Sequence, residues 1–220
     1  MIQPIVAGVY RVPGVVANCY VLTGTDGVDV IDAGLPYSHR QILAFLRRLG
    51  REPGAVRQIL ITHADRDHVG GAAALRAATG ARVVAGPLEG AAMSHARETR
   101  RVGLPGPMRG AFEAASQLLF ARVTPVAPDT AVNDGDELIG VARLRVLHTP
   151  GHTPGHMSYF APDLGVLFAG DSLRSFGGRL RASFGANTDN EVQAQESAWR
   201  QLTLNPEVIL AGHGTPVWTK

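Results

Sequence analysis

Hydrophobic residues in the first third of the chain form short runs separated by turn residues. The runs are residues 5–12, 15–22 and 28–31, and Pro13-Gly14 and Thr25-Asp26-Gly27 separate them. Short apolar runs bounded in this way are typical of β-strands. Over residues 38–49 the apolar positions recur at the helical period instead, so the pattern predicts a helix that Ser38 caps and Gly50 ends.

The same two patterns continue through the rest of the chain. We expect strands at 56–61, 82–85, 137–139, 143–147, 157–160, 166–169 and 208–211, and helices at 71–79 and 191–202. Segment 86–129, which contains a helical patch at 112–120, is expected to be either a lid over a site or an edge elaboration that contacts another subunit. Because no repeat or linker interrupts the chain, we predict one α/β domain over residues 1–220.

Composition narrows the classes of function. The chain has 220 residues, of which 45% are hydrophobic and 18% charged, so it can fold around a core. Its formal net charge of +2 comes from scattered arginines, which does not predict nucleic-acid binding. We find neither a signal peptide nor an apolar run of the ~18 residues that a membrane span needs, so we expect a soluble, cytoplasmic protein with no membrane partner. The single cysteine, Cys19, is expected in the core.

Histidines and aspartates concentrate where predicted strands end. The densest cluster is His63-Ala64-Asp65-Arg66-Asp67-His68, which follows the strand at 56–61. Further candidates are the histidines of segment 148–156, Gly170-Asp171 and Gly212-His213-Gly214. If the first cluster is an extended loop, its alternate side chains point the same way and its last two diverge. Ligand-type groups would then surround a space wide enough for two cations.

These residues, taken in order, resemble the metallo-β-lactamase superfamily, which includes glyoxalase II thioesterases and lactonases. The leading motif of that family is H-x-H-x-D-H, followed by a lone His, a lone Asp and a final His. This chain supplies His63, Asp67, His68, His152, Asp171 and His213 in that order, and the likeness begins at Ile31-Asp32-Ala33-Gly34. The resemblance implies an α/β fold of four layers, αββα, in which two packed mixed sheets are flanked by helices.

The resemblance also implies two divalent metal ions. The first would be held by His63, Asp65 and His152, the second by Asp67, His68 and His213, and Asp171 would bridge them. Asp65 departs from the family, which usually has His there. It is either a carboxylate ligand, a group that supports a ligand, or the ion-pair partner of Arg66. Zinc is the ion we expect first, and a carboxylate ligand would favour manganese or iron as alternatives.

Roles for the remaining candidates follow from the same resemblance. Two such ions can share a hydroxide that attacks a carbonyl, and we expect Asp67 to orient this nucleophile and pass on its proton. Asp32 either orients a metal ligand or forms a turn. His156 is assigned to a structural hydrogen bond in its loop, with contact to the substrate as the alternative. Arg174 and Arg179 either bind a substrate carboxylate or belong to a solvated loop.

A hydrolase of a small ester, thioester or lactone fits these residues best. Glutathione is not expected in the substrate, because glyoxalase II uses a helical C-terminal region to bind it and this chain ends soon after His213. A β-lactamase is disfavoured, because the subclass with a bridging Asp keeps His at the position of Asp65. The alternatives are a mononuclear iron dioxygenase that acts on a persulfide and a binding module that has lost its metals. A homodimer is compatible with the sequence, which does not determine the oligomeric state.

Overall fold

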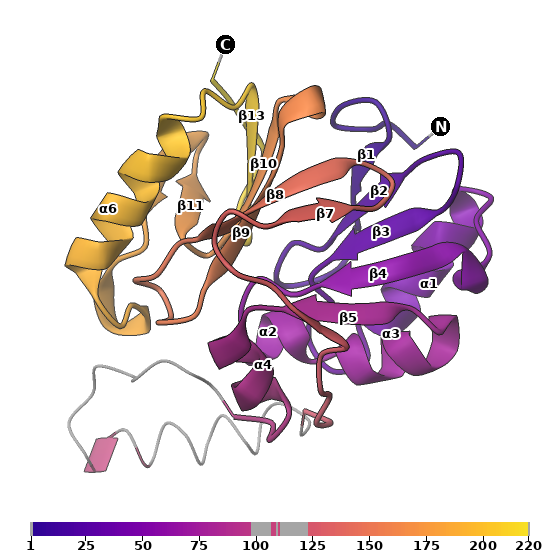
Figure 1. Ribbon diagram of the computed structural model, residues 1–220, viewed down its shortest axis with the longest axis horizontal. Helices are drawn as coiled ribbons and strands as arrows, with labels where there is room; N and C mark the ends of the chain where they lie inside the picture. Colours follow the sequence, from indigo (N-terminus) through magenta and orange to yellow (C-terminus); the bar gives the residue numbers. More distant parts are fainter. Residues whose placement is uncertain (1, 98–106, 109, 111–122, 220) are drawn as a thin grey trace.

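Two sheets packed face to face form the centre of the protein (Figure 1). The computed structural model describes residues 2–97, 107–108, 110 and 123–219, and within them each sheet has six strands. The first sheet consists, in spatial order, of β1 (Val9–Arg11), β2 (Tyr20–Thr23), β3 (Val28–Ile31), β4 (Val56–Leu60), β5 (Arg82–Ala85) and β6 (Thr130–Ala131). The second consists of β14 (Val217–Trp218), β13 (Val208–Ala211), β10 (Val166–Gly170), β9 (Met157–Ala161), β8 (Arg143–His148) and β7 (Glu137–Ile139).

Both sheets are mixed. In the first sheet β1, β2 and β3 are antiparallel, whereas β3 to β6 run parallel. In the second sheet β10 pairs with β13 in parallel and with β9 antiparallel. The described helices are α1 (His39–Arg48), α2 (Arg66–Val69), α3 (Ala72–Thr79), α4 (Pro87–Met93) and α6 (Glu191–Leu202). A separate hairpin joins β11 (Leu173–Phe176) to β12 (Arg179–Ala182).

The layers follow from the direction of the strand side chains, because successive residues of a strand point to opposite faces of its sheet. Leu60 packs between the sheets in one cluster with Phe168, whereas its neighbour Ile59 packs outward in a cluster with Ile42 of α1. On the outer face of the second sheet, Ile209 packs in a cluster with residues of α6. Figure 1 shows α1 and α3 outside the first sheet and α6 outside the second. The predicted four-layer αββα arrangement is therefore confirmed.

Several predicted elements match the structure residue for residue, namely 28–31, 82–85, 137–139, 191–202 and 208–211. Gly50 and the glycine after α3, Gly80, adopt left-handed backbone with φ of 71° and 73°. These positions end their helices because glycine has no Cβ to clash there. Cys19 is fully buried in the core, as expected.

Other predictions were wrong at their boundaries. The strand expected at 15–22 begins only at Tyr20, because the chain before it turns to place Asn18 beside Gly212. Ser38 precedes α1 but makes no capping hydrogen bond; its side chain is buried where Gly34 leaves it room. The strand expected at 5–12 is reduced to β1.

Two chemically important segments also differ from expectation. The cluster at 63–68 is not an extended loop throughout, because Arg66 begins α2. The arginines after Asp171 lie on the β11–β12 hairpin rather than in a loop. The helical patch expected at 112–120 lies outside the described residues, and segment 86–129 begins with α4. Among the described helices, none has the length and apolar character to cross a membrane.

Candidate metal centre

The candidate ligands lie at strand ends from both sheets. The cluster at 63–68 follows β4 of the first sheet, and His152 lies in the loop between β8 and β9 of the second. Asp171 follows β10 and His213 follows β13, two parallel neighbours that end side by side. The structure therefore brings together groups that are far apart in sequence.

The first group consists of His63, Asp65 and His152, and all three side chains are buried. Oδ2 of Asp65 lies 3.2 Å from Nε2 of His152 and 3.6 Å from Nε2 of His63. Two ligands bound at ~2.0–2.2 Å to one tetrahedral ion are about 3.3–3.5 Å apart. Asp65 therefore has the separation from both imidazoles that a shared metal ion requires.

The second group consists of Asp67, His68 and His213 and is more open. Oδ2 of Asp67 lies 3.2 Å from Nε2 of His213, and both side chains are about one third exposed, at 29% and 35%. Asp171 lies between the groups: its Oδ1 is 3.5 Å from Nε2 of His68, whereas its Oδ2 is 3.6 Å from Nε2 of His152. One carboxylate thus faces ligand atoms of both groups.

Hydrogen bonds to Nδ1 orient three of the imidazoles. The Nδ1 atom of His63 pairs with Oγ1 of Thr62, and that of His68 pairs with Oδ2 of Asp32. The Nδ1 atom of His152 pairs with Oγ of Ser183. Nε2 of each ring consequently faces the centre. In His63 and His68 this buried nitrogen has no hydrogen-bond partner among the described residues. Such an arrangement fits metal ligation, in which the second ring nitrogen is held by a neighbour.

Electrostatics favour a cation at this position. Burial opposes ionisation of Asp65 and Asp171, but the close side chains of His152 and His68, respectively, outweigh it and hold both pKa values well below the usual range. Burial likewise opposes protonation of His68, yet the carboxylates of Asp32 and Asp67 raise its pKa well above the ordinary value. Ionised carboxylates thus surround a buried space that favours positive charge.

His156 belongs to the framework around the ligands. Its Nε2 accepts a hydrogen bond from the backbone N–H of Asp171, and its Nδ1 pairs with Oγ1 of Thr149. Burial, with a smaller contribution from His63, lowers its pKa well below the ordinary value, so the ring stays neutral. A neutral ring that accepts from Asp171 matches the structural hydrogen bond assigned to it from the sequence.

A cavity of about 400 Å³ opens onto the centre. Its walls are formed by Asp65, Asp67, His152, Asp171, Arg174, Phe176, Asn187 and His213. The Arg174 guanidinium lies 3.6 Å from Oδ2 of Asp171 and is 16% exposed. Arg179, by contrast, is exposed at the turn of the hairpin, paired with Phe176. Of the two predicted arginines, Arg174 is therefore the one that borders the candidate ligands.

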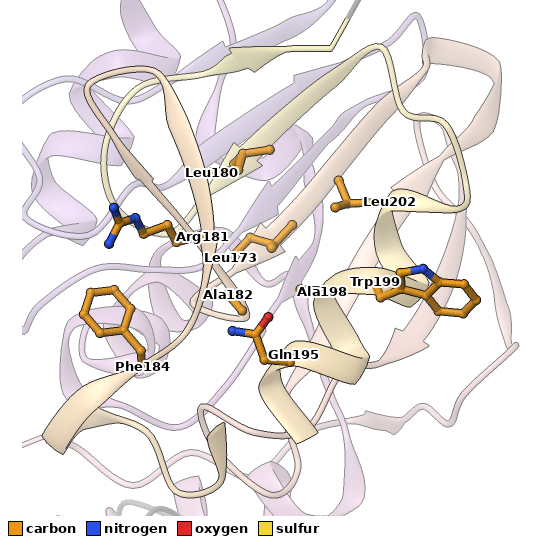
Figure 2. Close-up of a pocket in the computed structure, with 9 residues that line it drawn as sticks. All are labelled: Leu173, Leu180, Arg181, Ala182, Phe184, Gln195, Ala198, Trp199 and Leu202. Atoms are coloured by element: carbon orange, nitrogen blue, oxygen red, sulfur yellow. The ribbon is translucent and has the colours of Figure 1, made fainter. Parts of the chain in front are cut away.

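A second cleft lies on the other side of the hairpin, against α6. Figure 2 shows its walls, with Phe184 at one end and Trp199 and Leu202 at the other. Apolar side chains dominate this cleft, and its polar lining residues are Arg181 and Gln195. These walls contain neither carboxylate nor imidazole, and the candidate ligands line the cavity beside Arg174 instead.

Sequence reasoning missed the residues that fix the loop of His213. The Asn18 side-chain amide donates to the carbonyls of Ala211 and Gly214, and its backbone N–H donates to Gly212. Tyr20 Oη also donates to Ala211. These contacts bracket His213 from the first sheet. No motif in the sequence links Asn18 to the loop of His213, which lies far away along the chain.

Asp32 supports ligands of both groups, which makes it a sensitive position. Its carboxylate accepts from Nδ1 of His68 and from the backbone and hydroxyl of Thr62, whose hydroxyl also contacts His63. An Asp32→Asn substitution turns an amide N–H toward one of these donors, so we expect a ~10–100-fold loss of metal affinity. Competition with a chromophoric chelator would measure the metal affinity. Asp136→Asn is the control, because Asp136 lies on an exposed turn. Unchanged affinity would show that Asp32 only shapes a turn.

Comparisons with known proteins agree with this geometry. A family model described as the metallo-beta-lactamase superfamily matches residues 12–213. A hydroxyacylglutathione hydrolase of Cereibacter sphaeroides is 33% identical over 86% of this chain and 57% of its own length. The chain thus spans little more than half of that relative.

Solved structures give the same result for the fold. A metallo-beta-lactamase family protein from Thermus thermophilus matches with 28% identity and a TM-score of 0.73, over 97% of this chain and 76% of its own. A metallo-beta-lactamase of Cronobacter sakazakii with a HARLDQ motif matches with 26% identity and a TM-score of 0.73, over 96% of this chain and 79% of its own. Since the family model covers nearly the whole chain, the protein belongs to the metallo-β-lactamase superfamily, and its His and Asp clusters are the candidates for a metal site of that family.

Proposed function

We propose that the protein hydrolyses an ester, thioester or lactone of a small molecule with two divalent metal ions. The observation that carries the proposal is the pair of adjoining ligand groups, in which Asp171 faces both His68 and His152. The first ion would be held by His63, Asp65 and His152, and the second by Asp67, His68 and His213. Zinc is the ion expected first for such histidine and carboxylate ligands, with manganese or iron as alternatives.

Two bound ions would supply a water acidified to a pKa near 7 and a Lewis acid for the substrate carbonyl. The chain's own residues then set the geometry. Asp67, at the wall of the cavity, is suited to orient the attacking water and take its proton. Arg174 is suited to bind an anionic group of the substrate beside the reacting carbonyl.

Elemental mass spectrometry on protein purified without added metal tests this function first. We expect two equivalents of zinc or manganese per chain. The loaded protein should then hydrolyse members of a panel of thioesters and lactones, and a chelator should abolish the activity. A metal content near zero after reconstitution, or an inactive protein with two ions, would contradict the proposal.

Metal removal should also lower thermal stability. An ion that binds the folded chain alone and is present at 100 times its Kd adds about 2.7 kcal/mol to the free energy of unfolding. For a chain of this size that corresponds to a rise in Tm of about 5–10 °C per ion. Melting curves recorded with and without chelator, followed by zinc add-back, would measure the shift. Coincident curves would argue against a bound ion.

Arg174 should determine the preference for charged substrates. In an Arg174→Met variant, we expect the KM of a carboxylate-bearing thioester to rise about tenfold, because the charge-assisted hydrogen bond is lost. The KM of a neutral analogue should stay unchanged. Since Arg174 also approaches Asp171, a disturbed metal centre would affect both substrates equally. Only a selective change supports the binding role.

A second candidate function rests on the first ligand group. Two histidines and one carboxylate, here His63, His152 and Asp65, are the ligand set typical of non-haem iron oxygenases. A mononuclear iron dioxygenase that acts on a persulfide would use this group alone. A single iron per chain and consumption of oxygen in the presence of a persulfide would favour it over the hydrolase.

A further inference from the structure

Glu89 is a fully buried carboxylate on α4, outside both ligand groups. A carboxylate is seldom placed out of reach of solvent unless its oxygens receive hydrogen bonds. Three such donors are present here. Oε2 accepts from the backbone N–H of Ala64 at 2.7 Å, and Oε1 accepts from Oγ1 of Thr153 at 2.7 Å and from the backbone N–H of Gly155 at 3.1 Å.

These donors belong to the two loops that carry the first ligand group. Ala64 lies between His63 and Asp65, and Thr153 follows His152 directly. The β4 loop and the β8–β9 loop come from different sheets, and the Glu89 carboxylate connects them. Its hydrogen bonds therefore fix the separation of Asp65 from His152.

Two glycines make room for this connection. A Cβ on Gly155 would lie 2.7 Å from Oε1 of Glu89, and a Cβ on Gly86, just before α4, would lie 2.6 Å from Cε of Met157. A side chain at Gly155 would push α4 away from the β8–β9 loop, whereas one at Gly86 would first displace the side chain of Met157 in β9. The glycine at position 155 thus lets the Glu89 carboxylate lie closer to the β8–β9 loop than a residue with a side chain would allow.

We propose that Glu89 is a positioning residue for the first metal ion. It holds the loops of His63, Asp65 and His152 at the spacing the ion requires. The inference rests on the metal centre proposed above and assigns Glu89 to one of its two ions. Supporting groups of this kind typically change metal affinity by ~10–100-fold.

Cobalt(II) titration of the metal-free full chain tests the assignment, because the visible spectrum of cobalt depends on its coordination geometry. In Glu89→Gln, an amide N–H would face one of the present donors. We expect the first equivalent to bind ~10–100-fold more weakly and with altered absorption bands, whereas the affinity of the second equivalent changes less.

Asp29→Asn is the matched control. Asp29 is also fully buried and accepts a backbone hydrogen bond, from Val141 at 2.9 Å, but its contact lies away from the candidate ligands. Loss of folding stability alone would affect both variants in melting curves of the metal-free protein. A changed cobalt spectrum confined to Glu89→Gln separates positioning from stability.

Thr153→Val provides a milder test should Glu89→Gln fail to fold, because it removes one donor and keeps the backbone donors of Ala64 and Gly155. An intermediate loss of first-ion affinity is expected. Wild-type affinity and spectrum in the folded variants would overturn the role of Glu89. If the wild-type chain itself binds no cobalt, the metal centre is wrong and the role of Glu89 is overturned with it.

Discussion

An Asp67→Asn variant that carries the same number of metal ions as the wild type is expected to turn over substrate ~10²–10⁴-fold more slowly, the usual contribution of a general base. Asp67 lies at the wall of the cavity, with Oδ2 3.2 Å from Nε2 of His213. Burial opposes its ionisation, but the neighbouring His68 outweighs this effect and lowers the pKa of the carboxyl. The carboxylate is therefore ready to take a proton at neutral pH, whereas an amide is not.

Metal content must be measured alongside the kinetics, because Asp67 is also a candidate ligand. Single-turnover rates should be compared at equal metal occupancy, determined by elemental mass spectrometry. Asp163→Asn is a suitable control, since that carboxylate is exposed and paired with Arg143. A variant with full metal content and unchanged turnover would leave Asp67 without a catalytic role.

A single methyl group at Gly212 is expected to inactivate the protein, with a loss of about 10²-fold or more in turnover. A Cβ there would collide with Oδ1 of Asp171 and lie 2.7 Å from Cε1 of His68. The backbone cannot move aside easily, because Gly212 donates to Gly170 and accepts from Asn18. The collision must displace Asp171, which faces both ligand groups.

Gly54→Ala is the control for this substitution. A Cβ on Gly54 would meet nothing within 4 Å, and its φ is not in the left-handed region. We expect wild-type activity and metal content for that variant, and for Gly212→Ala a folded protein with reduced metal content. An active Gly212→Ala protein with two ions would show that the centre tolerates a shift of Asp171.

Most helices and strands of the fold could be predicted from the sequence, because the buried residues of each layer recur at the period of a strand or a helix. Strands buried on both faces, such as β10 and β13, appear as unbroken apolar runs, and α6 follows the helical period. The pattern failed at α2 and at the β11–β12 hairpin. In both elements, polar residues that face the candidate metal centre interrupt the hydrophobic period. The local sequence pattern therefore does not indicate the helix or strand that tertiary packing stabilises there.

The candidate ligands could be predicted because the chain order of His and Asp after strands is itself a local signal. Their supporting groups could not. Ser183, Asn18 and Glu89 contact segments far away in sequence, and each is an ordinary polar residue in its own surroundings. Their contacts join residues that are far apart in the sequence, and such contacts form only after the two sheets have packed.

His68 lies in α2, just after β4 of the first sheet, and His213 follows β13 of the second, so an ion held by both would affect folding kinetics and cooperativity. An ion bound by both acts as a reversible cross-link between the first and last parts of the chain, whose closure costs entropy in the unfolded state. Neither half can open fully while the ion remains. Amide hydrogen exchange should therefore slow together in β4 and β13 when metal is added, because local opening of either strand then requires release of the ion.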